Sequence, residues 1–341
     1  MPSGDATSAA IRAHFARQGE ACGKLGSSFT ARLCAVLGEG LQVGEPLGDA
    51  VLGWEGDPGA DALALRVCGG LQALSWEDAR LEALWPPQEV GDAEFADGLM
   101  GWIAEEGTRV VPWLASAPQT NEVGRSGVLL GGLLHLADGR DFELLEIGAS
   151  AGLNLYAERY GYDLGVGHWG GGPVALACDW SGQVPPLDRE VRVAARSGCD
   201  LAPIDVAVGA ERRRLMAYIW PDQAARRARI AAAVDLVAEA RPEIVRQGAA
   251  AFLAERLAAP APEGRQRVVM HSIMWQYMPK AEQARTEAVI REAGADGRLD
   301  AWLRMEADAE PGSASVMLTR FPGGSEELGR ADFHGRWARW S

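Results

Sequence analysis

"LLEIGASAGLNL", residues 144–155, is the stretch that decides the fold. A short apolar run leads into Gly148-Ala-Ser-Ala-Gly152, and a helix-like segment follows. Strand, glycine-rich turn and helix in that order are typical of a parallel α/β sheet. The turn allows two interpretations. It is either a GxSxG nucleophile elbow with Ser150 as the attacking hydroxyl, which predicts a hydrolase, or a cofactor turn whose middle glycine is replaced by Ser150.

The acid before the turn favours the cofactor. A carboxylate at the end of a buried strand is costly unless something binds it, and a hydrolase has no use for Glu146. The pattern [DE]-x-G-x-G-x-G, in contrast, places an acid beside a cofactor's polar groups. The elbow also needs an acid and then a histidine, and no clear acid precedes His271 on a loop after a strand. We predict cofactor contacts from five residues of this stretch: Glu146, Gly148, Ser150, Gly152 and Asn154.

Composition narrows the class of protein. The 341 residues are 48% hydrophobic and 23% charged, which is ordinary for a globular chain, and the net charge is −14. This acidity argues against a nucleic-acid surface, which needs clustered Lys and Arg. The five cysteines form no CxxC pair and no HExxH occurs, so we expect no metal site. No signal peptide or membrane span is recognisable. We expect a cytoplasmic protein with a small-molecule substrate and make no prediction of its oligomeric state.

Hydrophobic spacing changes near residue 140. Before it, helical periodicity predicts a mostly helical N-terminal region, 1–140, that packs on a sheet. From 141 to 341 strands alternate with helices and end in antiparallel strands. This order predicts a Rossmann-like, doubly wound α/β domain with an antiparallel C-terminal edge. A glycine-rich stretch near 161–190 is expected to be an insertion, "LNLYAERY" a helix, and "LGRADFHGRWARW" a single closing strand.

Further polar candidates follow the later strands. Asp200 in "SGCDLAPID" ends a predicted strand, where a carboxylate can accept hydrogen bonds from both ribose hydroxyls of a cofactor. Asp179 in "ACDWSG" is the rival and lies closer in sequence to the turn, but the surroundings of Asp200 match a second cofactor motif better. His271, at the end of "VVMHSIMW", is either a general base or substrate ligand, or a histidine hydrogen-bonded within the sheet.

Seven stretches, spread over nearly the whole chain, together resemble an uncharacterised bacterial family, a domain of unknown function: "PQTNEVGRSGVLL", "LLEIGASAGLNL" with "ERYGYDLG", "RSGCDLAPIDV", "WPDQAARRARI", "VVMHSIMWQYMP" and "HGRWARW". That family is similar in pattern to the class I S-adenosylmethionine-dependent methyltransferases. The resemblance implies a methyltransferase-type sheet and S-adenosylmethionine as cofactor, but no particular reaction. The chain departs from the methyltransferase pattern at Ser150, in the insertion before Asp200, and at Gly248 or Ala249, where an acid often follows the third strand.

The resemblance also points to "TNEVGR", residues 120–125, just before an apolar helix. Such a loop can fold over the carboxyl edge of the sheet, where ligands bind in open α/β folds. Arg125 is a candidate clamp for a carboxylate or phosphate, and Glu122 a candidate acid or base. The alternative is a helix cap formed by Thr120 or Asn121 beside a solvated ion pair. The leading hypothesis is a small-molecule methyltransferase; a serine hydrolase using Ser150 and a non-catalytic ligand-binding protein are the alternatives.

Overall fold

A computed structural model describes residues 4–341. The backbone forms two compact units. One contains the residues up to Thr120 together with Gly209–Ala228, and the other contains Asn121–Val208 and Arg229–Ser341. The division differs from the boundary expected at residue 140, because residues 121–140 belong to the unit that contains the sheet.

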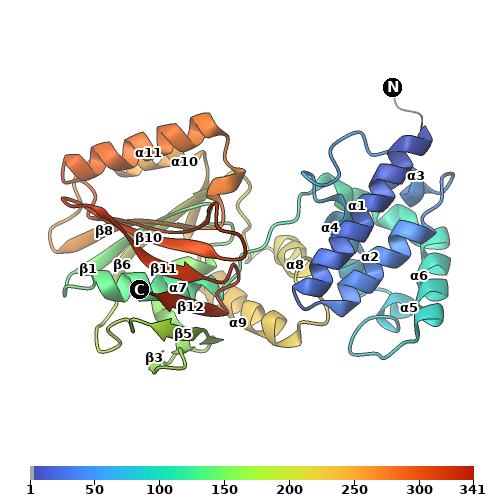
Figure 1. The fold of residues 1–341 in the computed structure, drawn as a ribbon, viewed down its shortest axis with the longest axis horizontal. Helices are drawn as coiled ribbons and strands as arrows, with labels where there is room; N and C mark the ends of the chain where they lie inside the picture. The colour runs from blue at the N-terminus through green and yellow to red at the C-terminus, as the bar shows by residue number, and fades with distance from the viewer. Residues whose placement is uncertain (1–3) are drawn as a thin grey trace. The chain divides into compact units, whose positions relative to one another are not determined.

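The first unit is built from helices (Figure 1). The apolar stripes expected from the sequence lie inside three of them, where Leu33, Leu71 and Phe95 are buried in one core. Ser27 begins one of these helices, since its side chain accepts from the Thr30 backbone N–H. The expected helical character of the N-terminal region is confirmed. The elements are α1 (Gly4–Lys24), α2 (Ser28–Gly40), α3 (Pro46–Leu52), α4 (Leu63–Leu74), α5 (Ala79–Glu82), α6 (Asp92–Glu106), the 3-10 turns Gly107–Arg109 and Val111–Ala115, and α8 (Gly209–Ala217).

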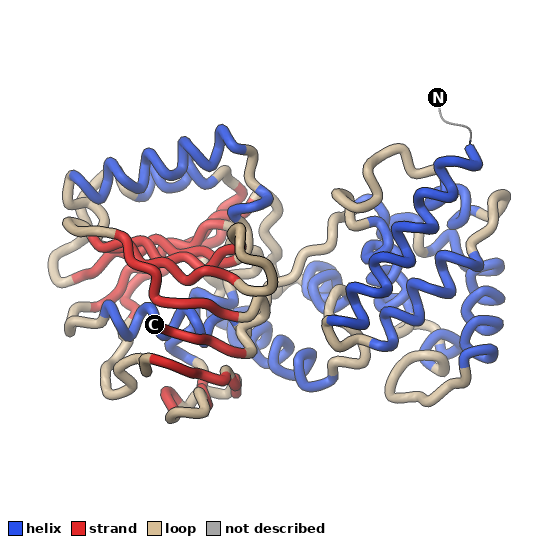
Figure 2. The backbone as a smooth tube through the Cα atoms, in the orientation of Figure 1, coloured by secondary structure: helices blue, strands red, loops and turns tan. Residues whose placement is uncertain are grey.

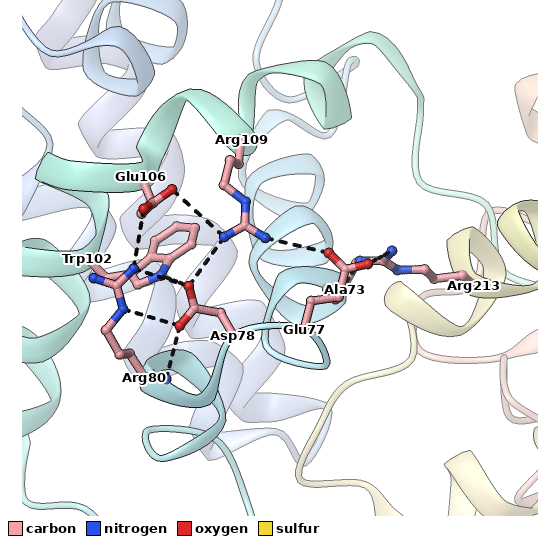
Figure 3. Close-up of polar contacts among 8 residues, drawn as sticks. All are labelled: Ala73, Glu77, Asp78, Arg80, Trp102, Glu106, Arg109 and Arg213. Atoms are coloured by element: carbon pink, nitrogen blue, oxygen red, sulfur yellow. Dashed lines mark hydrogen bonds and ion pairs between the residues drawn. The ribbon is translucent and has the colours of Figure 1, made fainter.

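Helix α8 joins this unit from far along the chain. Arg213 donates to the carbonyl oxygen of Ala73 at 2.9 Å and forms an ion pair with Glu77 (Figure 3). The helical unit is therefore completed by residues that follow several strands of the other unit in sequence. The next helix, α9 (Ala224–Ala240), begins in this unit and continues into the second.

Asp78 lies at the centre of a polar network in the helical unit (Figure 3). Its carboxylate accepts from the Arg80 backbone N–H at 3.0 Å, which caps α5, and from the Trp102 indole at 2.8 Å. The guanidinium groups of Arg80 and Arg109 lie 3.2 and 3.3 Å from it. Hydrogen bonds from Arg80 and then Trp102 hold the pKa of Asp78 well below its ordinary value. The network links α5 to α6 and to the turn that follows it.

Asp78→Ala is expected to lower the free energy of unfolding by about 2–3 kcal/mol, because it removes a helix cap and the acceptor for an indole N–H. Asp78→Asn is the matched control; it keeps one acceptor and loses less. The depressed pKa of Asp78 means that its contribution is present at neutral pH and is lost as the pH falls through the folded-state pKa. The variants should therefore converge with the parent chain on acidification. Urea denaturation measures this, and equal stability of all three chains at pH 7 would refute it.

The second unit is organised around a nine-stranded sheet with the order β5-β12-β11-β10-β9-β8-β1-β6-β7. The five strands β9, β8, β1, β6 and β7 are neighbours that pair in parallel. The strands β9, β10, β11 and β12 pair with their neighbours in antiparallel fashion, and β5 pairs in parallel with β12. A large, mostly parallel sheet with an antiparallel C-terminal part is thus confirmed. The strands are β1 (Asp141–Ile147), β5 (Asp179–Gly182), β6 (Val193–Asp200), β7 (Glu243–Arg246), β8 (Arg265–Ser272), β9 (Ala301–Ala307), β10 (Ala314–Arg320), β11 (Ser325–Ala331) and β12 (Trp337–Trp340).

Helices cover both faces of this sheet (Figures 1 and 2). On one face, α10 (Ala249–Arg256) and α11 (Lys280–Ala295) bury Phe252 and Ile290 against Leu145 of β1. On the other, α7 (Arg125–Leu136) packs so closely on β9 that a Cβ added to Gly132 would lie 2.5 Å from a Leu303 methyl carbon. Two helical layers around parallel strands leave the carboxyl ends of β1, β6 and β8 at one edge of the sheet.

The expected insertion contains a small separate sheet with the order β3-β2-β4. Its strands are β2 (Gly161–Asp163), β3 (His168–Gly170) and β4 (Ala175–Ala177). The following strand, β5, instead extends the main sheet beyond β12. Asp179, the first residue of β5, therefore stands at the far edge of the sheet, away from β1 and β6 in the strand order.

Two expected elements differ in the structure. The segment after the glycine turn is a 3-10 helix, Leu153–Arg159, interrupted at Tyr156 rather than a continuous α-helix. The Tyr160 hydroxyl donates to the carbonyl oxygen of Leu153, which a regular helix would use internally, and the Tyr162 hydroxyl donates to the carbonyl oxygen of Ala157.

The closing segment "LGRADFHGRWARW" forms parts of two strands, β11 and β12, rather than one. A turn separates them, in which Asp332 accepts from the backbone N–H groups of His334 and Arg336 at 3.0 and 3.2 Å. Gly335 has φ +74, a left-handed conformation that glycine adopts readily. The aspartate and the glycine together reverse the chain.

Candidate functional site

The turn after β1 has an unusual backbone. Gly148, Ser150 and Gly152 have φ values of +67, +53 and +77. A Cβ on Gly148 would lie 2.8 Å from Met274, which follows β8, and one on Gly152 would lie 3.0 Å from Ile244 of β7. The two glycines therefore let the turn approach the neighbouring strand ends closely. Ser150 holds a left-handed conformation that costs a non-glycine residue roughly 1–2 kcal/mol, and such strain clusters at functional sites.

Asp200 lies directly beside this turn, at the end of β6. One carboxylate oxygen accepts from the Ser150 backbone N–H at 2.9 Å, and the other accepts from the Ala202 backbone N–H at 2.8 Å. A carboxylate has about four acceptor positions and is the kind of group that binds hydroxyl groups of a ligand. Of the two rival acids, the structure brings Asp200 to the turn, whereas Asp179 lies in β5 at the far edge of the sheet.

Glu146, near the end of β1, is almost entirely enclosed, with 2% of its surface exposed. Burial raises the pKa of Glu146 to about 8; a hydrogen bond from Asn154 opposes this shift, and the charge of Asp200 adds to it. Three buried oxygen atoms of this group have no hydrogen-bond partner within residues 4–341: Glu146 Oε2, Asn154 Oδ1 and Ser150 Oγ. Buried polar atoms without partners are rare in folded proteins and call for an explanation.

The loop that precedes α7 folds over the same edge. The side chain of Asn121 accepts from the Leu153 backbone N–H at 2.8 Å, and Glu122, which is 1% exposed, accepts from the Gly124 backbone N–H at 3.1 Å. Arg125 donates to the carbonyl oxygens of Phe333 at 2.9 Å and Ser272 at 3.4 Å. Its positive charge also lowers the pKa of Glu146, which shows that the two groups interact. Of the two candidates in this loop, Arg125 thus acts on Glu146, whereas the Glu122 side chain binds the backbone of its own loop.

His271 is fully buried near the end of β8, and both ring nitrogens are engaged. Nε2 accepts from the Trp302 indole N–H at 3.0 Å, because an indole nitrogen only donates. Nδ1 therefore carries the proton and donates to Glu306, with 2.6 Å between Nδ1 and Oε1. The Trp275 ring stacks on the imidazole at 5.1 Å between ring centroids. Of the two roles open for His271, this geometry favours the hydrogen-bonded structural role over that of a general base.

Glu306 of β9 is the site residue that sequence reasoning missed. Besides His271, its carboxylate accepts from the backbone N–H groups of Met274 at 3.1 Å and Trp275 at 3.2 Å. It thereby holds the turn after β8, in which Ile273 has φ +49, a strained value for a β-branched residue. The only signal in the sequence is an acid inside the mostly apolar strand "AWLRMEA", which also contains Arg304.

A serine-hydrolase site needs a base within reach of Ser150 Oγ. In the described chain, this oxygen has no hydrogen-bond partner, and His271 is committed to Glu306 and Trp302. The geometry therefore gives the nucleophile interpretation no support. No three His, Cys, Asp or Glu side chains among residues 4–341 gather as they would around a metal ion.

The arrangement is that of an α/β protein with polar side chains gathered at the carboxyl edge of its parallel strands. The chain belongs to a bacterial family described as "Uncharacterized protein conserved in bacteria (DUF2332)", whose model matches residues 12–340. The resemblance to an uncharacterised bacterial family is thereby confirmed. No curated protein and no solved structure matches the chain. None of the helices in the described part is long and apolar enough to span a membrane.

Proposed function

We propose that the protein binds S-adenosylmethionine at this edge and is a methyltransferase acting on a small molecule. The observation that carries the proposal is the set of three unpartnered oxygens beside the strained turn. Carboxylate and amide oxygens are acceptors, so Glu146 and Asn154 call for a ligand group that donates hydrogen bonds. An ammonium group does so, and it also stabilises the ionised form of a buried carboxylate. The amino-acid end of S-adenosylmethionine carries such a group.

The remaining contacts agree with this ligand. In this proposal Arg125, whose charge acts on Glu146, attracts the carboxylate of the same amino-acid end. The Asp200 carboxylate, which lies beside the turn, accepts from the ribose hydroxyls, and the glycines of the turn leave its backbone accessible. The parallel strands have the order β7-β6-β1-β8-β9, so the turn after β1 lies where the order of connection reverses, which is the usual ligand position in doubly wound sheets. When bound, S-adenosylmethionine supplies an electrophilic methyl group.

Isothermal titration of the full chain with S-adenosylmethionine and S-adenosylhomocysteine tests the proposal. We expect both to bind with micromolar affinity. Ser150→Gly should keep the fold and most of the affinity, because glycine adopts φ +53 without strain. Ser150→Leu should abolish measurable binding by filling the space beside the turn. The absence of heat with either ligand and the parent chain would refute the proposal.

A methyl-transfer assay over a panel of metabolites then separates two outcomes. Turnover supports the methyltransferase, whereas tight binding without turnover on any substrate supports the ligand-binding protein on the same fold. Loss of all activity in Ser150→Gly with unchanged ligand affinity would instead support the nucleophile interpretation of Ser150.

A further inference from the structure

A second concave site lies at the opposite edge of the sheet, where β1, β8 and β9 begin. It is a cavity of about 410 Å³ lined by the end of α7, the residues just before β1 and β9, and the end of β10 with Pro322. This volume lies in the range of small-molecule sites, about 300–1,000 Å³. None of its lining residues belongs to the candidate site described above.

An unsatisfied polar side chain forms part of the cavity wall. Gln266, the second residue of β8, is 5% exposed, and its Oε1 atom is buried without a hydrogen-bond partner within residues 4–341. Leaving such an acceptor unpaired costs about 1–3 kcal/mol. A ligand group that donates a hydrogen bond, such as a hydroxyl, satisfies it.

Three arginines line the same cavity. Arg140 is neutralised by Asp138 and Asp300, each at 2.8 Å. Arg189 differs, because its Nη1 donates to the Ala137 carbonyl oxygen at 3.0 Å and no ion pair to a carboxylate is found for it in the described chain. Arg320 pairs with the half-exposed Glu326. Of the three arginines at the cavity, Arg189 is therefore the one that no carboxylate of the described chain neutralises through an ion pair.

His135 also lines the cavity, and the charges of Arg320 and Arg189 act on it. His135, in the last turn of α7, has a pKa below its ordinary value, first because of burial and next because of Arg320, with a further contribution from Arg189; Glu326 opposes the shift. The two arginines, on different elements, both act on His135, but burial is the larger cause and Glu326 opposes them.

We propose that this cavity binds a small anion that also carries a hydroxyl group. Its carboxylate or phosphate oxygens accept from the guanidinium groups of Arg189 and Arg320, which suit such oxyanions. Its hydroxyl donates to Gln266. The site is independent of the proposed methyltransferase function and lies at the amino edge of the sheet rather than at the carboxyl edge.

Four probes at constant ionic strength test the proposal by isothermal titration: glucose 6-phosphate, citrate, inorganic phosphate and glucose. Glucose 6-phosphate or citrate should bind at least about ten-fold more tightly than inorganic phosphate, and glucose should not bind. The better of the two shows whether phosphate or carboxylate is preferred. If none of the four binds, or if inorganic phosphate binds as tightly as the hydroxylated anions, the proposal is wrong.

Variants assign the contacts. Arg189→Gln should weaken the hydroxylated anion about ten-fold or more, and Gln266→Leu should remove its advantage over inorganic phosphate. Arg189 also binds the end of α7, and the loss of that contact can by itself keep Arg189→Gln from folding. In that case Arg320→Gln, a change at another arginine of the cavity wall, tests the same contact with the anion. Arg192→Gln is the matched control, since that arginine pairs with Asp141 and Glu190 outside the cavity wall. Equal losses in Arg192→Gln and the arginine variants of the cavity would overturn the assignment.

Discussion

Glu146→Gln is expected to make the protein more stable above pH 8 while weakening its binding of S-adenosylhomocysteine. Burial raises the pKa of Glu146 from its ordinary value of 4.5 to about 8, so the folded chain holds this proton more tightly than the unfolded chain. Stability of the parent chain should therefore fall from about pH 4.5 to pH 8 and level off above. Each pKa unit corresponds to about 1.36 kcal/mol. Between pH 4.5 and pH 8, the free energy of unfolding of Glu146→Gln should therefore rise relative to that of the parent chain by on the order of 2–5 kcal/mol.

In Glu146→Gln, stability above pH 8 should rise while affinity for S-adenosylhomocysteine falls. A charge-assisted hydrogen bond contributes about 1.5–3 kcal/mol, so affinity should fall about 10- to 100-fold, more than in Ser150→Gly. Glu143→Gln on the same strand is the matched control, because that carboxylate has Arg267 at 3.2 Å and its loss should destabilise the fold. Denaturation in urea from pH 5 to pH 9 measures the effect. A stability difference that does not change with pH would contradict the prediction.

Glu306→Gln is expected to lower the free energy of unfolding by about 2–4 kcal/mol, since three N–H donors converge on this carboxylate. An amide offers them one oxygen and turns its own N–H₂ group toward them. The turn after β8 should loosen, and with it Met274, which packs over Gly148. We therefore also expect weaker binding of S-adenosylhomocysteine, although Glu306 need not contact the ligand.

The matched control for this change is Glu326→Gln, an exposed glutamate on β11 whose loss should change stability by less than about 0.5 kcal/mol. Urea denaturation gives the stability, and titration gives the affinity. A positioning role requires both quantities to fall in Glu306→Gln. An unchanged affinity with lowered stability would restrict Glu306 to a structural role, and unchanged stability would contradict the geometry of the turn.

Local patterns predicted the elements better than their connections. The stripes in α2, α4 and α6 and the run that becomes β8 are visible because apolar periodicity directly reflects burial on one face. The irregular helix after Gly152 was not predictable, because the apolar pattern does not show that the hydroxyl groups of Tyr160 and Tyr162, a few residues further along the chain, bind its carbonyl oxygens. The turn between β11 and β12 rests on an aspartate and a glycine that the strand-like pattern around them obscured.

The same distinction applies to the candidate site. Glu146 and Asp200 stood out because an acid at the end of a predicted strand is unusual in itself. Glu306 did not, because its role depends on the parallel pairing of β8 with β9, which brings it to His271 across 35 positions of sequence. Neither Glu306 nor His271, taken alone in the sequence, indicates that β8 pairs with β9. The hydrogen bonds that occupy both nitrogens of His271 are likewise visible only once the strands are in register.

The helical unit is formed by two separate parts of the chain, which are synthesised at different times. The helices up to Thr120 leave the ribosome first, but α8, which Arg213 fastens to Ala73 and Glu77, is made only after β1 and β6. At about 5–20 residues per second, roughly 5–20 s pass between the synthesis of the early helices and that of α8. Over that interval, apolar surface that α8 covers later is exposed to the cell. This exposure occurs at a stage when six of the nine strands of the main sheet are still untranslated.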